Sequence, residues 1–234
     1  MDPIEAGAKH VQATGLFETT MLTAQLPNAE ALNAKLLQTV LDRMGGDAGV
    51  EHSNVRGWQS APDMLSGRWG GESAVQVAQF ALGACNRYST DLKPADTPRF
   101  EWTADMWANV NREGASNNWH VHPQAFWSAV YYVADGYASA DDPALGGEIV
   151  FQDPRFPMNR MFSSELVPLA SSGRPQHWFS SVRPRAGMLI AFPSWLFHKV
   201  QPYRGEGTRV SLALNMTVMP ARRGASGLGA DSWR

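Results

Sequence analysis

Two histidines one residue apart, His120 and His122, stand in the segment NWHVHP, directly before the apolar run FWSAVYYV. Because successive side chains of a β-strand point to opposite faces, residues two apart share a face and can converge on one ion. Histidine is also the commonest metal ligand among protein side chains. The pair could supply two ligands of a metal site, although each histidine alone could equally be a hydrogen-bonded residue of the core or its rim.

A third histidine and an arginine follow in GMLIAFPSWLFHKVQPYRGEGTRVSLALN. His198 comes after a Pro-Ser turn and opens a predicted strand, and Arg209 begins the next one. That second strand alternates: one face carries Arg209, Ser211, Ala213 and Asn215, and the other carries Val210, Leu212, Leu214 and Met216. A buried guanidinium is costly unless it is paired, so Arg209 requires an anionic partner. That partner is either a structural glutamate or an anionic ligand.

Two helices and a set of short strands must position these residues. Apolar residues at spacings of three and four predict one helix capped by Asn28 and ending at Gly45-Gly46, and a second from Ser73 to Tyr88. From Phe100 onward, runs rich in aromatic and β-branched residues predict strands near 100–110, 126–133, 148–151, 176–182, 188–192, 198–203 and 209–218. We therefore expect a mainly β protein, with a jelly-roll core and the N-terminal helices packed on one sheet.

Composition narrows the class of protein. The chain has 234 residues, 44% hydrophobic and 18% charged, which predicts one domain: a helical part (1–99), a jelly-roll core (100–220) and a flexible tail (221–234). A net charge of −2 without basic or acidic blocks predicts neither a nucleic-acid nor a membrane partner. The single cysteine, Cys85, excludes an internal disulfide and a cysteine-based metal cluster. No signal peptide or membrane-length apolar stretch is present, so we expect a cytoplasmic protein.

Four motifs in this order resemble those of the iron(II)- and 2-oxoglutarate-dependent dioxygenases. They are His120-Val121-His122-Pro123, Val130-Tyr131-Tyr132-Val133, the segment from Gly147 to Asp153-Pro154-Arg155, and the segment from Phe192-Pro193-Ser194-Trp195 to His198. The chain is most similar to a group of 2-oxoglutarate/iron oxygenases that carry all four. The resemblance covers about 102–218, half of the chain, and implies a double-stranded β-helix, the cupin-like form of the jelly roll.

The resemblance also implies roles for individual residues. His120, His122 and His198 fall on the positions of the iron ligands, and Arg209 falls on the residue that pairs with the distal carboxylate of 2-oxoglutarate. Ser211, Tyr132 and, more weakly, Asn109 and Asn111 fall near that carboxylate. Fe(II) and 2-oxoglutarate are the implied cofactor and cosubstrate, and hydroxylation of a small molecule or peptide with O2 is the implied reaction, with succinate and CO2 released.

One position departs from the superfamily. The residue two after His120 is His122, where the usual site has an aspartate or glutamate. Three-histidine iron sites also occur in thiol dioxygenases that use no 2-oxoglutarate, so an enzyme of that kind is one alternative. A non-catalytic jelly roll that binds a metal or 2-oxoglutarate is another.

Substrate contacts are the least defined part of the prediction. Trp127 and Trp195, together with Trp119, flank the candidate ligands in sequence and could form a substrate wall, although core packing is their commoner role. Arg155 could hold an anionic group of a substrate or simply pair with Asp153. The sequence leaves the substrate and the oligomeric state open, with a homodimer as one option.

Overall fold

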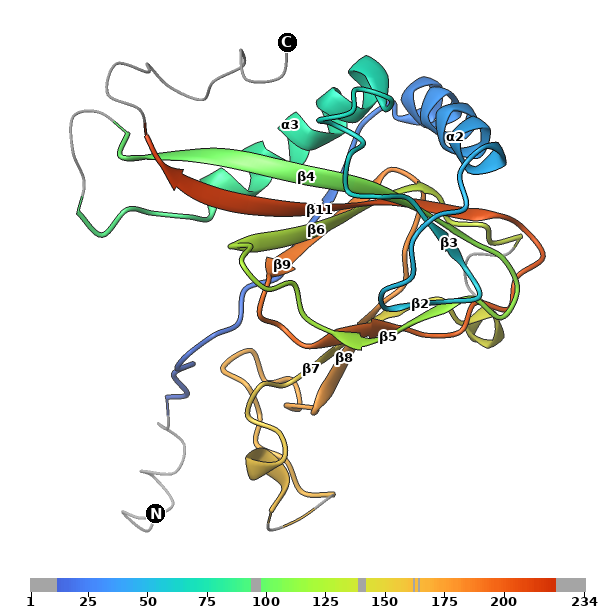
Figure 1. Ribbon diagram of the computed structural model, residues 1–234. Helices are drawn as coiled ribbons and strands as arrows, with labels where there is room; N and C mark the ends of the chain where they lie inside the picture. Colours follow the sequence, from blue (N-terminus) through green and yellow to red (C-terminus); the bar gives the residue numbers. More distant parts are fainter. Residues whose placement is uncertain (1–11, 94–97, 139–141, 162, 164, 222–234) are drawn as a thin grey trace, which may run out of the picture.

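The computed structural model describes residues 12–93, 98–138, 142–161, 163 and 165–221 (Figure 1). Two antiparallel sheets face each other, and two helices cover the outer side of the larger sheet. The six-stranded sheet has the order β1 (Leu22–Gln25), β9 (Met188–Pro193), β6 (Trp127–Ala134), β11 (Arg209–Pro220), β4 (Phe100–Asn111) and β3 (Trp58–Gln59). The five-stranded sheet has the order β2 (Asn54–Val55), β5 (Ser116–His120), β10 (His198–Val200), β7 (Ile149–Gln152) and β8 (Phe179–Val182). This is the predicted jelly roll, a double-stranded β-helix.

Strand β11 lies at the centre of the larger sheet, between β4 and β6. Its alternation is the one that the sequence predicts. Val210, Leu212, Leu214 and Met216 are buried under the helices, whereas Arg209, Ser211, Ala213 and Asn215 face the space between the sheets and line a cavity there. The same strand therefore builds the hydrophobic core with one face and the candidate site with the other.

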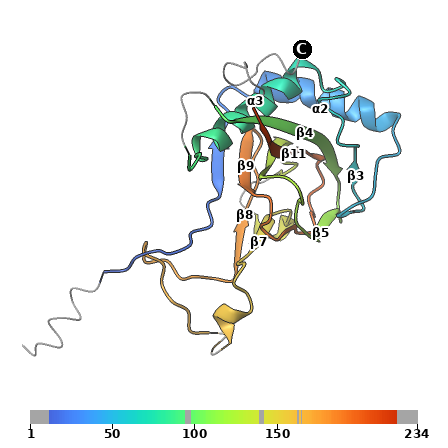
Figure 2. The ribbon, with the colours of Figure 1, turned by 60° about the vertical axis from the view of Figure 1, so that its left-hand side comes forward.

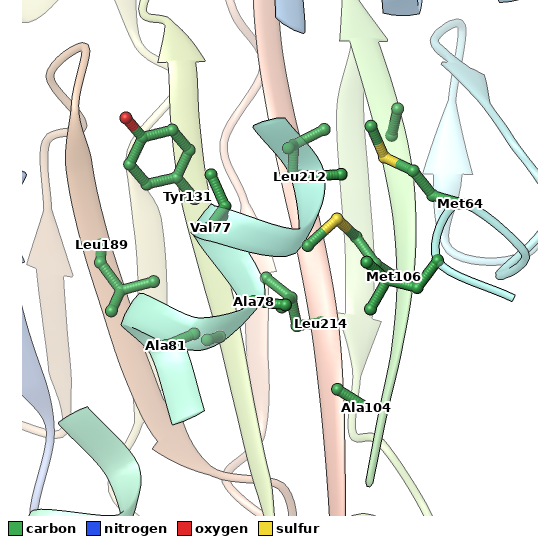
Figure 3. Close-up of a cluster of buried hydrophobic side chains, with 14 of the residues drawn as sticks. Met64, Val77, Ala78, Ala81, Ala104, Met106, Tyr131, Leu189, Leu212 and Leu214 are labelled. Carbon is green, nitrogen blue, oxygen red and sulfur yellow. The ribbon is translucent and has the colours of Figure 1, made fainter. Parts of the chain in front are cut away.

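Helices α2 (Glu30–Gly45) and α3 (Gly71–Arg87) lie side by side on the outer face of the larger sheet (Figure 2). Figure 3 shows Val77, Ala78 and Ala81 of α3 over the apolar face of the sheet, which Leu212 and Leu214 help to form. Small side chains on α3 allow the helix to approach the sheet closely, and the burial of this apolar surface stabilises the sheet that carries the site.

The helix limits agree with the prediction to within about two residues, but the predicted cap of α2 is wrong. Ala29 occupies the N-cap position without a side-chain hydrogen bond, and Asn28 precedes it with a φ of 52°. Asn28 therefore adopts the left-handed conformation that asparagine tolerates, and it turns the chain into the helix instead of capping it.

A smaller hydrophobic cluster joins the two sheets beside the cavity. It consists of Tyr132, Ile149, Phe151, Ile190, Phe192 and Leu196. These residues come from β6, β7, β9 and the turn before β10, and two of them, Tyr132 and Ile149, also line the cavity. The cluster holds the sheets at a fixed separation, so that residues from both can meet.

Several strands differ from their predicted limits. Strand β8 begins at Phe179 and β10 ends at Val200, so the predicted strands at 176–182 and 198–203 are too long. Strands β1, β2, β3 and β5 were not predicted. In β5 the sequence SNNWH carries two asparagines, which strands disfavour, and only pairing with β10 and β2 makes it a strand.

The described residues before Phe100 include strands β1, β2 and β3 as well as the helices, so both sheets receive strands from the N-terminal part. Residues 222–234, most of the predicted tail, lie outside the described residues. Within the described part of the chain, no helix is long and apolar enough to cross a membrane.

Candidate active site

The three candidate ligands meet between the sheets. His120 ends β5, His198 begins β10, and the two residues are partners in the ladder that joins these strands. His122 lies beyond the end of β5, so the strand alternation that suggested its direction does not apply to it. Its backbone N–H donates to the carbonyl of Ser194, 2.9 Å away, and this bond folds the chain back toward the other two histidines. One ring nitrogen from each histidine lies within 4.8 Å of the others.

Hydrogen bonds fix which nitrogen two of these rings present. Nδ1 of His120 lies 2.7 Å from the carbonyl oxygen of Asn118, and Nδ1 of His198 lies 2.8 Å from that of Leu196. A carbonyl can only accept, so both Nδ1 atoms carry the proton, and in the neutral rings both Nε2 atoms keep a free lone pair. The two rings therefore offer their Nε2 lone pairs to the centre of the cluster.

Burial keeps the cluster uncharged. Desolvation lowers the pKa of His120, lowers that of His122 to about 4 and lowers that of His198 to about 3. The positive charge that His120 would carry depresses the pKa values of His122 and His198 further. At neutral pH the three rings are neutral bases, which is the protonation state that a metal requires of histidine.

The spacing of the nitrogens fits a divalent metal. Nε2 of His122 and Nε2 of His198 are 3.3 Å apart. Neighbouring ligands on an octahedral ion with metal–nitrogen bonds of about 2.1 Å are roughly 3 Å apart, so a small adjustment accommodates the ion. Imidazole suits iron, zinc, copper and nickel, and the donor set alone does not choose between them.

The histidines open into a cavity of about 450 Å³, a volume typical of sites for small ligands. Four further candidates from the sequence line the same cavity: Tyr132 on β6, Asn109 on β4, and Arg209 and Ser211 on β11. Ser211 is the register partner of both Asn109 and Tyr132, so these three side chains form one row across the sheet. Asn111, the weaker candidate, is the partner of Arg209 and also lines the cavity.

Arg209 is 3% exposed, and among the described residues it forms no salt bridge. Its guanidinium donates to the carbonyl of Gly147, 2.6 Å away, hydrogen-bonds Tyr132 and lies over the ring of that tyrosine. Gly147 has a φ of 79°, and a Cβ there would lie 2.9 Å from the guanidinium nitrogen. The glutamate alternative is thus not observed, and the described residues that line the cavity include no carboxylate to balance this buried cation.

Burial raises the pKa of Tyr132, and the nearby charge of Arg209 opposes this rise only in part. The phenol therefore stays protonated at neutral pH. A protonated phenol beside a guanidinium presents two kinds of hydrogen-bond donor to an anion in the cavity.

The proposed substrate contacts lie elsewhere. Trp127 is buried under the helices, where its indole N–H donates to Ser89, and Trp195 is 55% exposed outside the cavity. Arg155 pairs with Asp153 at the surface, at 2.7 Å. Trp119 points away from the cavity and stacks between Phe179 and Phe197. Trp119 neighbours His120 on β5 and faces the opposite way, because successive residues of a strand point to opposite faces.

Sequence reasoning missed two cavity residues that contact His122. The ring of Trp107 stacks on that of His122 at 5.7 Å, and the side chain of Asn215 hydrogen-bonds the His122 ring. Both are in phase with predicted site residues, Trp107 with Asn109 on β4 and Asn215 with Arg209 on β11. The alternation of side chains along β4 and β11 could therefore have identified Trp107 and Asn215 as cavity residues. His52, which the sequence analysis does not single out, is exposed and also lines the cavity.

Comparison with known proteins gives a family and a fold. Residues 105–215 match the model of the family described as "Putative 2OG-Fe(II) oxygenase". No curated protein matches. Among solved structures, a prolyl-4-hydroxylase from Pseudomonas putida is 18% identical, with a TM-score of 0.51 over 85% of this chain and 92% of that one.

Two further structures show the same fold. A prolyl hydroxylase from Trichoplax adhaerens, solved with a peptide of hypoxia inducible factor, is 13% identical, with a TM-score of 0.56 over 84% of this chain and 83% of its own. The 2-oxoglutarate-dependent epimerase SnoN from nogalamycin biosynthesis is also 13% identical, with a TM-score of 0.57 over 92% and 88%. The family match covers every candidate ligand and cosubstrate residue, and it indicates a non-heme iron oxygenase that depends on 2-oxoglutarate.

Proposed function

We propose that the enzyme hydroxylates a small molecule or peptide, that His120, His122 and His198 hold the iron(II), and that Arg209 binds the distal carboxylate of 2-oxoglutarate. One observation carries the proposal: a single cavity holds both a cluster of three neutral imidazoles and a buried guanidinium that has no carboxylate partner among the described residues. A keto acid with a second carboxylate needs both features, one at each end.

The side chains around Arg209 suit this cosubstrate. A guanidinium can donate two parallel hydrogen bonds to one carboxylate, and Tyr132 and Ser211 can add hydroxyl donors from the adjoining strands. The amide of Asn109 is next in the same row. Because Gly147 and Tyr132 hold the guanidinium in place, it loses little freedom when the anion binds.

Iron(II) and 2-oxoglutarate, when bound, supply the activation of O2 for oxidation of a C–H bond, with succinate and CO2 as products. The chain's own contribution is placement and exclusion of water. Three neutral imidazoles leave the full +2 charge on the metal, whereas the usual carboxylate would reduce it to +1. The apolar cluster of Phe151, Ile190 and Phe192 backs the histidines and keeps that side of the site dry.

The lining of the cavity limits the substrate. Beyond the histidines and Arg209 it is formed by neutral amides and apolar groups, including Gln59, Asn117, Trp107 and Val130. Among the residues that the structure describes, no aspartate or glutamate lines it, so no described side chain there would balance a cationic substrate. A neutral substrate with groups that hydrogen-bond to amides fits best.

Turnover of 2-oxoglutarate tests the proposal. The purified protein should convert 2-oxoglutarate to succinate in the presence of iron(II), slowly without substrate, and a chelator should stop the reaction. His120→Ala and His198→Ala should lose both turnover and stoichiometric binding of iron(II) under anaerobic conditions. His177→Ala, which alters an exposed histidine outside the cavity, should bind iron(II) like the wild type. Full iron binding by either ligand variant would remove that residue from the metal site, and iron-dependent oxidation of a thiol without 2-oxoglutarate would favour a thiol dioxygenase.

A further inference from the structure

His122 is held differently from the other two histidines of the cluster. His120 and His198 each direct Nδ1 to a backbone carbonyl two residues earlier in the chain. His122 lies outside the strand, and its ring is hydrogen-bonded by a side chain, that of Asn215 on β11 in the opposite sheet. Since Nε2 of His122 lies beside Nε2 of His198, the nitrogen that remains for Asn215 is Nδ1.

Ring stacking alone cannot orient His122. Its ring is stacked with that of Trp107, at 5.7 Å and 28°, and with that of His198, at 5.2 Å and 7°. These contacts fix the plane of the imidazole. They are nearly indifferent to a 180° rotation about the Cβ–Cγ bond, which exchanges Nδ1 with Cδ2 and Nε2 with Cε1. A hydrogen bond at Nδ1 is what distinguishes the two orientations.

Asn215 is itself fixed by a neighbour. The hydroxyl of Ser128 donates to Oδ1 of Asn215 at 3.1 Å, and the two residues are register partners on β6 and β11. Ser128 is buried, so it has no water with which to exchange this bond. A carbonyl oxygen has two lone pairs, so Oδ1 can accept from Ser128 and from the Nδ1–H of His122 at once.

We propose that Asn215, held by Ser128, is a positioning residue for His122: it accepts the Nδ1–H of the ring and so directs Nε2 to the metal. This inference rests on the proposed function, because it assumes that His122 is a ligand. The side-chain amide of Asn215 thus accepts the Nδ1–H of His122, as the backbone carbonyls of Asn118 and Leu196 accept those of His120 and His198. Loss of such a partner behind a metal-bound histidine commonly weakens metal binding by about 10–100-fold.

The decisive experiment compares iron(II) affinity, measured by anaerobic calorimetry, in four proteins. Asn215→Ala should bind iron(II) about 10–100-fold more weakly than the wild type. Asn215→Asp keeps the acceptor and makes it anionic, so it should bind at least as tightly as the wild type. Asn117→Ala, which removes another cavity amide that bonds Ser53, should not change the affinity.

Nuclear magnetic resonance of the zinc-loaded protein gives a second readout that does not involve turnover. The Nδ1–H of His122 should be observed and slow to exchange in the wild type and in Asn215→Asp, and it should be lost to exchange in Asn215→Ala. If Asn215 had only a structural role, Asn215→Asp should weaken iron(II) binding as much as Asn215→Ala does. The buried charge of the aspartate would then be as harmful as the truncation.

Two results would overturn the inference: iron(II) affinity of Asn215→Ala within twofold of the wild type, or an unchanged His122 Nδ1–H in that variant. If the wild-type protein itself binds no iron(II), the proposed function fails instead. The two failures are therefore distinguishable.

Discussion

At the scale of single residues, the site departs from the usual iron oxygenase pattern at one position. His122 stands where a carboxylate is usual, and the structure surrounds it with groups suited to an imidazole: Trp107 against one face and Asn215 at an edge. A carboxylate would leave the face of Trp107 uncovered. The histidine is thus part of the local packing as well as of the proposed ligand set.

Arg209 leads to a prediction about the cosubstrate. Arg209→Ala should weaken binding of 2-oxoglutarate by about 10–100-fold, the equivalent of about 1.5–3 kcal/mol for hydrogen bonds to a charged group, and should leave iron(II) binding intact. Calorimetry under anaerobic conditions measures both. Arg155→Ala is the matched control, because Arg155 pairs with Asp153 outside the cavity. Equal affinity for 2-oxoglutarate in the wild type and Arg209→Ala would refute the assignment.

At the scale of elements, β11 shows how much of the site the sequence could predict. Its strict alternation predicts both faces, and Arg209 and Ser211, the two candidates on its inner face, line the cavity. Strand β5 shows the opposite case. Its asparagines conceal a strand that depends on pairing with β10, and the approach of His122 depends on a hydrogen bond to a turn far away in sequence.

The tryptophans expected to form a substrate wall do not line the cavity, for a related physical reason. Pattern analysis places a residue on a face of its own strand but does not say what lies opposite that face. Trp127 faces the helices, and Trp119 faces solvent and other aromatic rings. Which face meets the cavity is a property of the assembled sheets.

The core face of β11 gives a prediction about stability. Leu212 is fully buried between the sheet and the helices, so Leu212→Ala should lower the free energy of unfolding by about 2–5 kcal/mol. Met219→Ala, near the exposed end of the same strand, should change it by less than about 0.5 kcal/mol. Denaturation by urea measures both values. A small loss in Leu212→Ala would mean that the helices do not pack on β11 as described.

At the scale of the whole molecule, the residues that stabilise the fold and the residues that line the candidate site lie in different layers. The helices and the outer face of the larger sheet form the main core, and the space between the sheets carries the chemistry. Tyr131 and Tyr132 on β6 illustrate the division: Tyr131 points outward and donates to Asn33 of α2, whereas Tyr132 points inward beside Arg209. Neighbouring residues thus serve stability and binding respectively.

The single cysteine, Cys85, gives a prediction about how firmly α3 packs on the larger sheet. Cys85 is fully buried on α3, and burial raises the pKa of its thiol to about 12. At pH 8 the thiol is therefore protonated in the folded protein, and a thiol reagent should modify it only when the protein unfolds. The rate of labelling should rise with urea in parallel with unfolding. Rapid labelling of the native protein would show that α3 opens independently of the rest.

The central claim is that the three histidines and Arg209 form one site for iron(II) and 2-oxoglutarate. An anaerobic titration tests it most directly: iron(II) is added to the apoprotein, 2-oxoglutarate follows, and the visible absorption is recorded. We predict a metal-to-ligand charge-transfer band that saturates at one equivalent of iron(II) and is weakened in Arg209→Ala. Iron(II) binding without this band, or no binding of iron(II) at all, would contradict it.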